Sequence, residues 1–227
     1  MESQVALPVV SWAVWRATDQ EASPQVAFID PQIRRRLSLL DRIALHVAHA
    51  CVKPGEEVRT VFASRHGELA RSAELLGQLA QNEMPSPMAF SLSVLNAAIG
   101  LYGIARKDRS AATALASGED TFPMALIEAA AQAWDGREGP VVLTYADEPP
   151  PALYQPLVDS PRVAQAVAVR LDVKEATRPV VMSWQASDTE EDAEAAPQAF
   201  LSCLGDGVAS TWHGAGRAWS WRAHAHA

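Results

Sequence analysis

Several side chains beside two predicted turns have the chemistry of an acyl-transfer or hydrolysis site. Ser64 and His66 lie in the stretch SRHGE, and Ser117 lies just ahead of Glu119 and Asp120. A serine can attack an ester or thioester when a histidine takes its proton and a carboxylate orients that histidine. A stand-alone acyl-transfer or thioester hydrolase enzyme using Ser117 is therefore one interpretation of the sequence.

The surroundings of both serines argue against such an enzyme. No GxSxG motif, which would place a serine on a sharp strand-to-helix turn, surrounds Ser64 or Ser117. SRHGE is better explained as an ordinary strand-to-helix turn with Gly67 and Glu68 at the start of the helix. The two acidic residues after the second serine likewise precede an apolar helix, whose positive N-terminal end favours negative charge.

Histidines near the end of the chain are candidate metal ligands. His213, His224 and His226 include the pattern HAH, which binds nickel or copper weakly. No cysteine or acidic ligand stands at the spacing of a zinc site, and no glycine-rich loop with a lysine is present to hold a phosphate group. The sequence therefore predicts no metal ion and no cofactor.

The composition is that of an ordinary globular protein. Of the 227 residues, 48% are hydrophobic and 20% are charged, with a net charge of −8 and a pI near 5.2. This acidic balance argues against nucleic acid as a partner, because phosphate binding needs clustered cations. The one basic run, RRR at residues 34–36, is expected on the solvent-facing side of a helix.

Neither the cysteines nor the apolar runs point to export or to a membrane. Cys51 and Cys203 lie in apolar helical surroundings, where a free thiol behaves as a small hydrophobic side chain. The opening stretch has no basic region typical of a signal peptide. The apolar runs are also shorter than the roughly 20 residues that span a bilayer. We expect a cytoplasmic protein that does not enter a membrane.

Alternating strands and helices predict an α/β protein with a mostly parallel sheet. Asp30 and Pro31 begin a helix whose apolar positions recur at helical spacing until Pro54 and Gly55 end it. A second amphipathic helix follows SRHGE. Runs of β-branched, aromatic or small residues predict five strands, at residues 9–15, 58–64, 111–115, 141–147 and 163–173.

Two further predicted helices lack the charged face that a surface helix normally has. One covers residues 87–105, and the other covers residues 121–134. Because Pro123 is tolerated only near the start of a helix, the second helix should begin at about residues 119–122. A helix that is apolar nearly all round must be covered on more than one side.

The remainder of the chain predicts an extension of the domain rather than an independent second domain. Residues 185–198, QASDTEEDAEAAPQ, are acidic and poor in apolar side chains, as in an exposed loop. Residues 199–227 predict a short helix, a glycine turn and a tryptophan-rich strand. Trp212, Trp219 and Trp221 would fasten this strand to the main domain, residues 1–184.

The stretch TALASG, from Thr113 to Gly118, resembles the nucleophile turn TACASG of β-ketoacyl synthases, the condensing enzymes of fatty-acid and polyketide assembly. In that family the middle cysteine attacks an acyl thioester at the N-terminus of a buried helix, which lowers the pKa of the thiol. Leu115 occupies the matching position, and its side chain has no lone pair to donate. The resemblance therefore implies a protein without the family's catalytic activity.

Further motifs extend the resemblance from about Trp12 to Trp221: RRRLS, VFASRHGEL, SPMAFSLSVLNAAIG and RAWSW. They look like the short branch of the family, the ketosynthase-like chain-length factors of aryl-polyene-type pathways. The implied fold is half of a thiolase-like fold, a mixed five-stranded sheet with helices on both faces, plus the C-terminal helix and strand. The other half, which supplies paired catalytic histidines in the active enzymes, has no room in this sequence.

The resemblance also implies an active β-ketoacyl synthase as partner, whose acyl tunnel this chain shapes within a heterodimer. The C-terminal segment and the partner would together cover the apolar helices. An acyl carrier protein, itself acidic, would take part only indirectly by docking on the synthase. A homodimeric acyl-binding protein is a further alternative. The expected interface comprises Ala111, Ala112, Thr113, Ala114 and Leu115, and the expected tunnel lining comprises Ser91, Val94, Leu95, Ala98 and Ile99.

Overall fold

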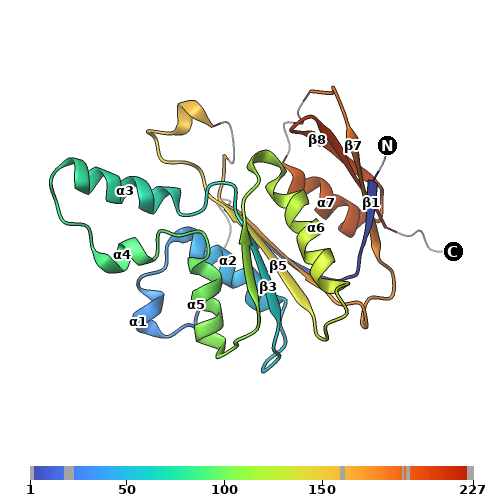
Figure 1. Ribbon diagram of the computed structural model, residues 1–227, viewed down its shortest axis with the longest axis horizontal. Helices are drawn as coiled ribbons and strands as arrows, with labels where there is room; N and C mark the ends of the chain where they lie inside the picture. Colours follow the sequence, from blue (N-terminus) through green and yellow to red (C-terminus); the bar gives the residue numbers. More distant parts are fainter. Residues whose placement is uncertain (1–2, 18–22, 159–161, 191, 193–194, 224–227) are drawn as a thin grey trace.

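Two stacked β-sheets organise the chain (Figure 1). The computed structural model describes all residues except 1–2, 18–22, 159–161, 191, 193–194 and 224–227. The first sheet has the strand order β2-β6-β5-β3-β4 and the second has the order β1-β7-β9-β8. The strands are β1 (Ser3–Leu7), β2 (Val9–Arg16), β3 (Arg59–Ala63), β4 (Ala112–Leu115), β5 (Val141–Asp147), β6 (Gln165–Leu171), β7 (Val180–Ala186), β8 (Ser210–Gly214) and β9 (Arg217–Ala223).

The first sheet is mixed, as the family resemblance implied, so the mostly parallel sheet expected from the alternation of strands and helices is wrong. Strand β3 runs parallel to both β4 and β5, whereas β6 is antiparallel to β5 and to β2. Its strands lie at the five predicted positions. Strand β4 is at one edge of this sheet, because it pairs only with β3.

Residues of alternate positions face opposite sides of this sheet, as the two-residue period of a strand requires. In β6 the alanines Ala166 and Ala168 join the core on the side of α2, while Val167 and Val169 join the core on the side of α6. The small alanines let α2 approach the sheet closely. The sheet therefore carries one apolar core on each face.

Helices cover both faces of the first sheet, which confirms the predicted fold class. Helices α2 and α5 lie on one face, and α6 and α7 lie on the other, between the two sheets (Figure 1). The helices are α1 (Pro31–Arg34), α2 (Leu39–Ala50), α3 (Leu69–Ala80), α4 (Pro87–Ser91), α5 (Ala97–Arg106), α6 (Thr121–Ala133) and α7 (Ala196–Asp206), with short 3₁₀ turns η1 (Gly118–Asp120) and η2 (Gln155–Leu157).

Helix α6 begins at Thr121, within the range predicted from Pro123. Its apolar face is fully buried by the first sheet on one side and by the C-terminal elements on the other. The ring of Phe200 on α7 lies 5.5 Å from the ring of Phe122 on α6 and 5.9 Å from that of Trp221 on β9. The chain thus covers this helix by itself.

Two predicted helices are interrupted in the structure. The predicted helix at residues 87–105 is wrong as a single element, because residues 92–96 separate α4 from α5. Near this break the hydroxyls of Ser91 and Ser93 donate to the carbonyls of Met88 and Phe90 at 2.9 and 2.8 Å, which competes with helical hydrogen bonding.

The helix predicted from Asp30 is likewise two helices. Asp30 caps only the short helix α1, by accepting from the backbone N–H of Gln32 at 2.8 Å. Ser38 then starts α2 through a reciprocal capping box with Asp41. The second cap explains why the chain breaks the helix here in spite of continuous apolar spacing.

The second sheet was not predicted, apart from its tryptophan-rich strand. Its strand β7 pairs on one side with β1, near the start of the chain, and on the other side with β9. Pairing over such a sequence distance leaves no local pattern to recognise. In the part of the chain that the structure describes, no helix is both long enough and apolar enough to cross a bilayer.

Candidate functional site

The turn between β4 and α6 holds Leu115, the last residue of β4. Its side chain is half-buried and packs against the core on the α6 side of the sheet. Beyond it, Gly118 adopts a left-handed conformation with φ of 59°, and the hydroxyl of Thr121 closes the turn. This hydroxyl accepts from the backbone N–H of Ser117 at 2.9 Å and donates to the carbonyl of Gly118 at 2.6 Å.

The side chains proposed for a serine hydrolase have structural partners of other kinds. The hydroxyl of Ser64 is buried, donates to Asp147 at 2.7 Å and accepts from the backbone N–H of Gly67 at 2.8 Å. It therefore ties the end of β3 to the end of β5. Glu119 forms an ion pair with Arg65 at 3.4 Å.

The second acidic residue of the turn, Asp120, joins the start of α6 to the C-terminal strand β9. Its buried carboxylate accepts from the guanidinium of Arg217 at 2.6 Å and from the indole N–H of Trp219 at 2.9 Å. Ser117 itself is exposed. The arrangement of Asp120 therefore serves the attachment of the C-terminal strands rather than a serine nucleophile.

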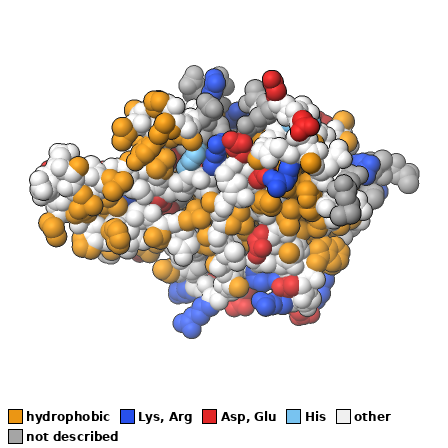
Figure 2. All heavy atoms as spheres, turned by 45° about the horizontal axis from the view of Figure 1, so that its top comes forward, with side chains coloured by type: hydrophobic (Ala, Val, Ile, Leu, Met, Phe, Trp, Pro, Cys, Tyr) orange, Lys and Arg blue, Asp and Glu red, His pale blue; other side chains and the backbone are white. Residues whose placement is uncertain are grey.

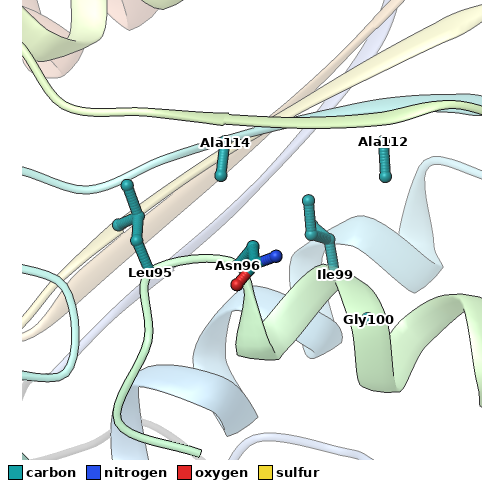
Figure 3. A pocket seen from close by; sticks show the side chains of 6 residues that line it. All are labelled: Leu95, Asn96, Ile99, Gly100, Ala112 and Ala114. Atoms are coloured by element: carbon teal, nitrogen blue, oxygen red, sulfur yellow. The ribbon is translucent and has the colours of Figure 1, made fainter.

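A cavity of about 370 Å³ lies between α5 and the edge strand β4. The side chains of Leu95 and Ile99 point up toward the strand, and those of Ala112 and Ala114 point down toward the helix (Figure 3). The small size of the alanines leaves the space between these elements open. The cavity is lined by Leu95, Asn96, Ile99, Gly100, Ala112 and Ala114.

The cavity brings together two residues of the predicted tunnel lining and two of the predicted partner interface. Among the other predicted lining residues, Ala98 is buried in the core beneath α5, and Ser91 and Val94 are exposed outside the cavity. Asn96 and Gly100 were missed, although Asn96 lies three residues before Ile99 and four before Gly100, a spacing that places residues on one helical face.

The remaining predicted interface residues lie elsewhere on the same strand. Ala111 is exposed and directly precedes β4. Thr113 and Leu115 face the opposite side of the sheet from the cavity, and the hydroxyl of Thr113 accepts from the amide of Gln132 on α6 at 3.1 Å. The alternation of the strand thus separates Leu115 from the cavity.

Strand β4 pairs with β3 along one side, and its other side is the outer edge of the sheet. The carbonyls of Ala111 and Leu115 accept from the backbone N–H groups of Thr60 and Ser64, at 3.0 and 3.4 Å. Since backbone groups alternate along a strand, those of Ala112 and Ala114 point outward. This edge can therefore accept a further strand.

A group of buried charges lies at the base of α3, apart from the cavity. Glu68 accepts from the hydroxyl of Ser38 at 2.6 Å and from Arg71 at 2.8 Å, and Arg71 also reaches Asp41 at 3.4 Å. Burial, together with the carboxylate of Glu68, raises the pKa of Asp41 to about 7 and that of Glu148 to about 7. These groups fix the start of α3 on α2.

The structure describes one of the three candidate metal ligands, His213. His213 lies 3.2 Å from a carboxylate oxygen of Asp192, and His224 and His226 lie outside the described residues. Within the described residues, no three histidine, cysteine or acidic side chains group as metal ligands would. Burial raises the pKa of the Cys51 thiol to about 11, so this thiol stays protonated and unreactive.

Solved structures share the fold. A structure of a ketosynthase, ApeO, in complex with its chain length factor, ApeC, from Xenorhabdus doucetiae matches with a TM-score of 0.83 and 24% identity, over 96% of this chain and 99% of the matched chain. The ishigamide ketosynthase/chain length factor matches with a TM-score of 0.55 and 17% identity, over 78% of this chain and 55% of the other. No curated protein sequence matches.

A structure described as a β-ketoacyl synthase is matched over about half its length. A β-ketoacyl synthase from Burkholderia phymatum STM815 matches with a TM-score of 0.58 and 10% identity, over 82% of this chain and 56% of the other. The family described as "Beta-ketoacyl synthase, N-terminal domain" matches residues 11–222. The chain therefore belongs to the family of β-ketoacyl synthase N-terminal domains.

Proposed function

We propose that this chain is a catalytically silent ketosynthase-like subunit, a chain-length factor that pairs with an active β-ketoacyl synthase and shapes its acyl tunnel. The product would be a polyketide or fatty-acid-type chain of an aryl polyene pathway. The observation that carries the proposal is Leu115, which ends β4 where the family has its reactive cysteine. An aliphatic side chain cannot form the acyl thioester that condensation requires.

The edge of β4 and the cavity beside it support pairing with a partner at this place. A strand added to the outer edge of β4 would satisfy the outward backbone groups of Ala112 and Ala114. The same strand would close the open side of the cavity lined by Leu95 and Ile99. An apolar cavity closed in this way has the character of a wall that contacts an acyl chain.

The similar structures support the same assignment. Two of them are described as a ketosynthase with a chain length factor, and one matched chain is covered to 99%, so it is about as short as this one. An acyl carrier protein would dock on the ketosynthase subunit, because this chain has a net charge of −8 and carriers are acidic.

Co-expression with a ketosynthase tests the pairing. We expect a one-to-one complex in size-exclusion chromatography and native mass spectrometry. Ala112→Pro removes an outward backbone N–H and leaves the hydrogen bonds to β3 in place, so it should abolish the complex while the isolated chain keeps its far-UV spectrum. A complex that forms as well with this variant would contradict pairing through β4.

Product length tests the tunnel wall. Ala114→Phe fills the cavity and should shorten the product of the complex, whereas Ala131→Phe, at an exposed alanine of α6, should leave it unchanged. The enzyme alternative would be supported instead if the isolated chain hydrolyses or transfers acyl thioesters. A stable homodimer that binds acyl chains would support the acyl-binding alternative.

A further inference from the structure

Among the described residues that line the cavity between α5 and β4, Asn96 alone has a polar side chain. This side chain lies between those of Leu95 and Ile99 in Figure 3. Figure 2 shows hydrophobic side chains spread over the preceding helices α3 and α4, and residues 84–105 contain no charged side chain. Asn96 is therefore a polar group in surroundings that are otherwise apolar.

The serines that precede Asn96 bond to their own backbone. Ser86 caps α4 by accepting from the backbone N–H of Ala89 at 3.4 Å, and Ser91 and Ser93 donate to carbonyls of the same helix. Asn96 is the N-cap of α5, a position at which asparagine usually accepts from the first turn. Its side chain makes no such bond, because its backbone is not extended (φ −88°, ψ 9°). The amide is thus left for a group outside the helix.

A glycine one turn further along α5 keeps the cavity open beside this amide. Glycine inside a helix lowers helix stability relative to alanine. A side chain on Gly100 would meet no atom of the described chain within 4 Å, whereas one on Gly103 would meet the carbonyl oxygen of Asp108 at 3.1 Å. Packing within the chain therefore explains Gly103 but not Gly100. The space at Gly100 lies on the same helical face as Asn96 and is available to a ligand.

Closing the cavity changes what the amide needs. In the isolated chain Asn96 is exposed, so water can satisfy its amide. A ketosynthase strand on the outer edge of β4 would exclude that water, and a covered amide without a hydrogen-bond partner costs free energy. In the proposed function the thioester lies on the ketosynthase, so the part of the acyl chain that reaches this cavity is the end remote from the thioester.

We propose that Asn96 hydrogen-bonds a hydroxyl group on that remote end of the acyl chain, and that Gly100 provides the space for it. An amide matches a hydroxyl, because each offers both a donor and an acceptor. This inference rests on the proposed function and adds the substrate class to it. The favoured acyl chains end in a hydroxyl-bearing group rather than in a plain hydrocarbon.

Elongation of two matched substrates by the co-expressed complex tests the inference. The two acyl thioesters have the same chain and end in a phenyl or a 4-hydroxyphenyl group. We expect a roughly tenfold higher kcat/KM for the hydroxyl-bearing substrate, because its loss leaves a covered amide unpaired. Asn96→Leu should lower kcat/KM for this substrate roughly tenfold and leave that of the phenyl substrate within a factor of about two.

Asn82→Gly is the matched control. It removes the other asparagine amide of the chain, at an exposed position with φ of 59° that glycine adopts readily, and should leave the preference unchanged. A preference that survives Asn96→Leu would overturn the inference. If Asn96→Leu fails to fold, the unmodified complex still decides, because equal kcat/KM for the two substrates would overturn the inference as well.

A larger side chain at Gly100 tests the space beside the amide. Gly100→Leu should shorten the longest product made from either substrate, because the added side chain occupies the cavity and meets no atom of the described chain close to its first carbon. Unchanged product lengths would show that the acyl chain does not use this space, which contradicts the inference.

The behaviour of the complex separates this inference from the proposed function. If the complex forms and elongates both substrates equally well, the pairing stands and the inference about Asn96 is wrong. If no complex forms, the proposed function fails and the inference fails with it. If Asn96→Leu weakens the complex and leaves the preference intact, the amide contacts the ketosynthase rather than the acyl chain, which also overturns the inference.

Discussion

Helix α6 and the apolar arm, which consists of α3, α4 and their links at residues 69–95, both have few charged side chains. Only α6 is covered by the chain itself. Phe122, Leu126 and their neighbours on α6 are almost wholly buried beneath α7 and the second sheet. Met84 and Phe90 on the arm are largely exposed. Apolar composition predicts that a segment needs a cover, and only the tertiary structure decides whether the cover comes from the same chain.

The comparison predicts that aromatic residues of the two regions contribute very differently to the stability of the isolated chain. Trp219→Ala removes a fully buried indole above α6 and should lower the free energy of unfolding by about 3–5 kcal/mol. Phe90→Ala should change it by less than about 0.5 kcal/mol, because this ring is largely exposed in the isolated chain. Urea unfolding measures the free energy of unfolding of both variants. Similar losses of stability in the two variants would contradict this prediction.

Removing the carboxylate that attaches the second sheet to α6 should lower the stability by a smaller but measurable amount. Asp120→Ala leaves the indole N–H of Trp219 without its acceptor and should cost about 1–3 kcal/mol. Glu138→Gln, in an exposed pair with Lys174, should leave the free energy of unfolding unchanged, because solvent screens this pair. If Asp120→Ala is as mild as this control, the carboxylate does not hold the cover in place.

The stability that the base of the arm gives to the fold should depend on pH. The pKa of Asp41 is about 7 in the folded chain because of burial and Glu68, against 3.8 ordinarily. Between these values the folded carboxyl keeps a proton that the unfolded chain has lost, so rising pH weakens the fold. Burial lowers the pKa of His49, which acts in the opposite direction, so a variant must isolate the effect.

Asp41→Asn provides that variant. Its stability relative to the parent should improve as pH rises from about 4 to about 7 and change little above that. Thermal unfolding over this range measures the trend, with Glu138→Gln as control because Lys174 lowers the pKa of Glu138. A parallel pH profile for Asp41→Asn and its parent would show that Asp41 is ionised in the folded chain.

The smallest expected effect concerns solubility. Phe90→Ser should leave the unfolding free energy within about 0.5 kcal/mol of the parent but slow the aggregation of the isolated chain. Light scattering at increasing concentration measures this. If Phe122→Leu on the covered helix slowed aggregation equally, exposure of the arm would not be the cause.

Local patterns in the sequence were enough to predict the first sheet. Each of its strands is a short run that is buried on at least one face, and Pro123 placed the start of α6. The interruption of the predicted helix at residues 87–105 was missed, because hydroxyls such as that of Ser93 act only once the chain has turned. The strands β1 and β7 were missed because they find their partners far away along the chain.

The candidate site was predictable only in part. The family resemblance led to the predictions for Leu115, Leu95 and Ile99, and the structure brings Leu95 and Ile99 to a cavity beside β4. The sequence did not show that Ala114 and Leu115 face opposite sides of the sheet, which puts the cavity and the side chain of Leu115 on different faces. That the cavity is part of an acyl tunnel stays a prediction.

The second sheet contains β1 and β9, which are made at very different times during translation. Strand β7 has β9 as a neighbour, and Trp219 and Trp221 of β9 lie in the core that encloses α6. In a growing polypeptide on the ribosome, α6 therefore lacks part of its C-terminal cover until residues 217–223 have emerged. Its native state must form late, after synthesis of this final strand, and a nascent chain arrested earlier would be prone to misfolding.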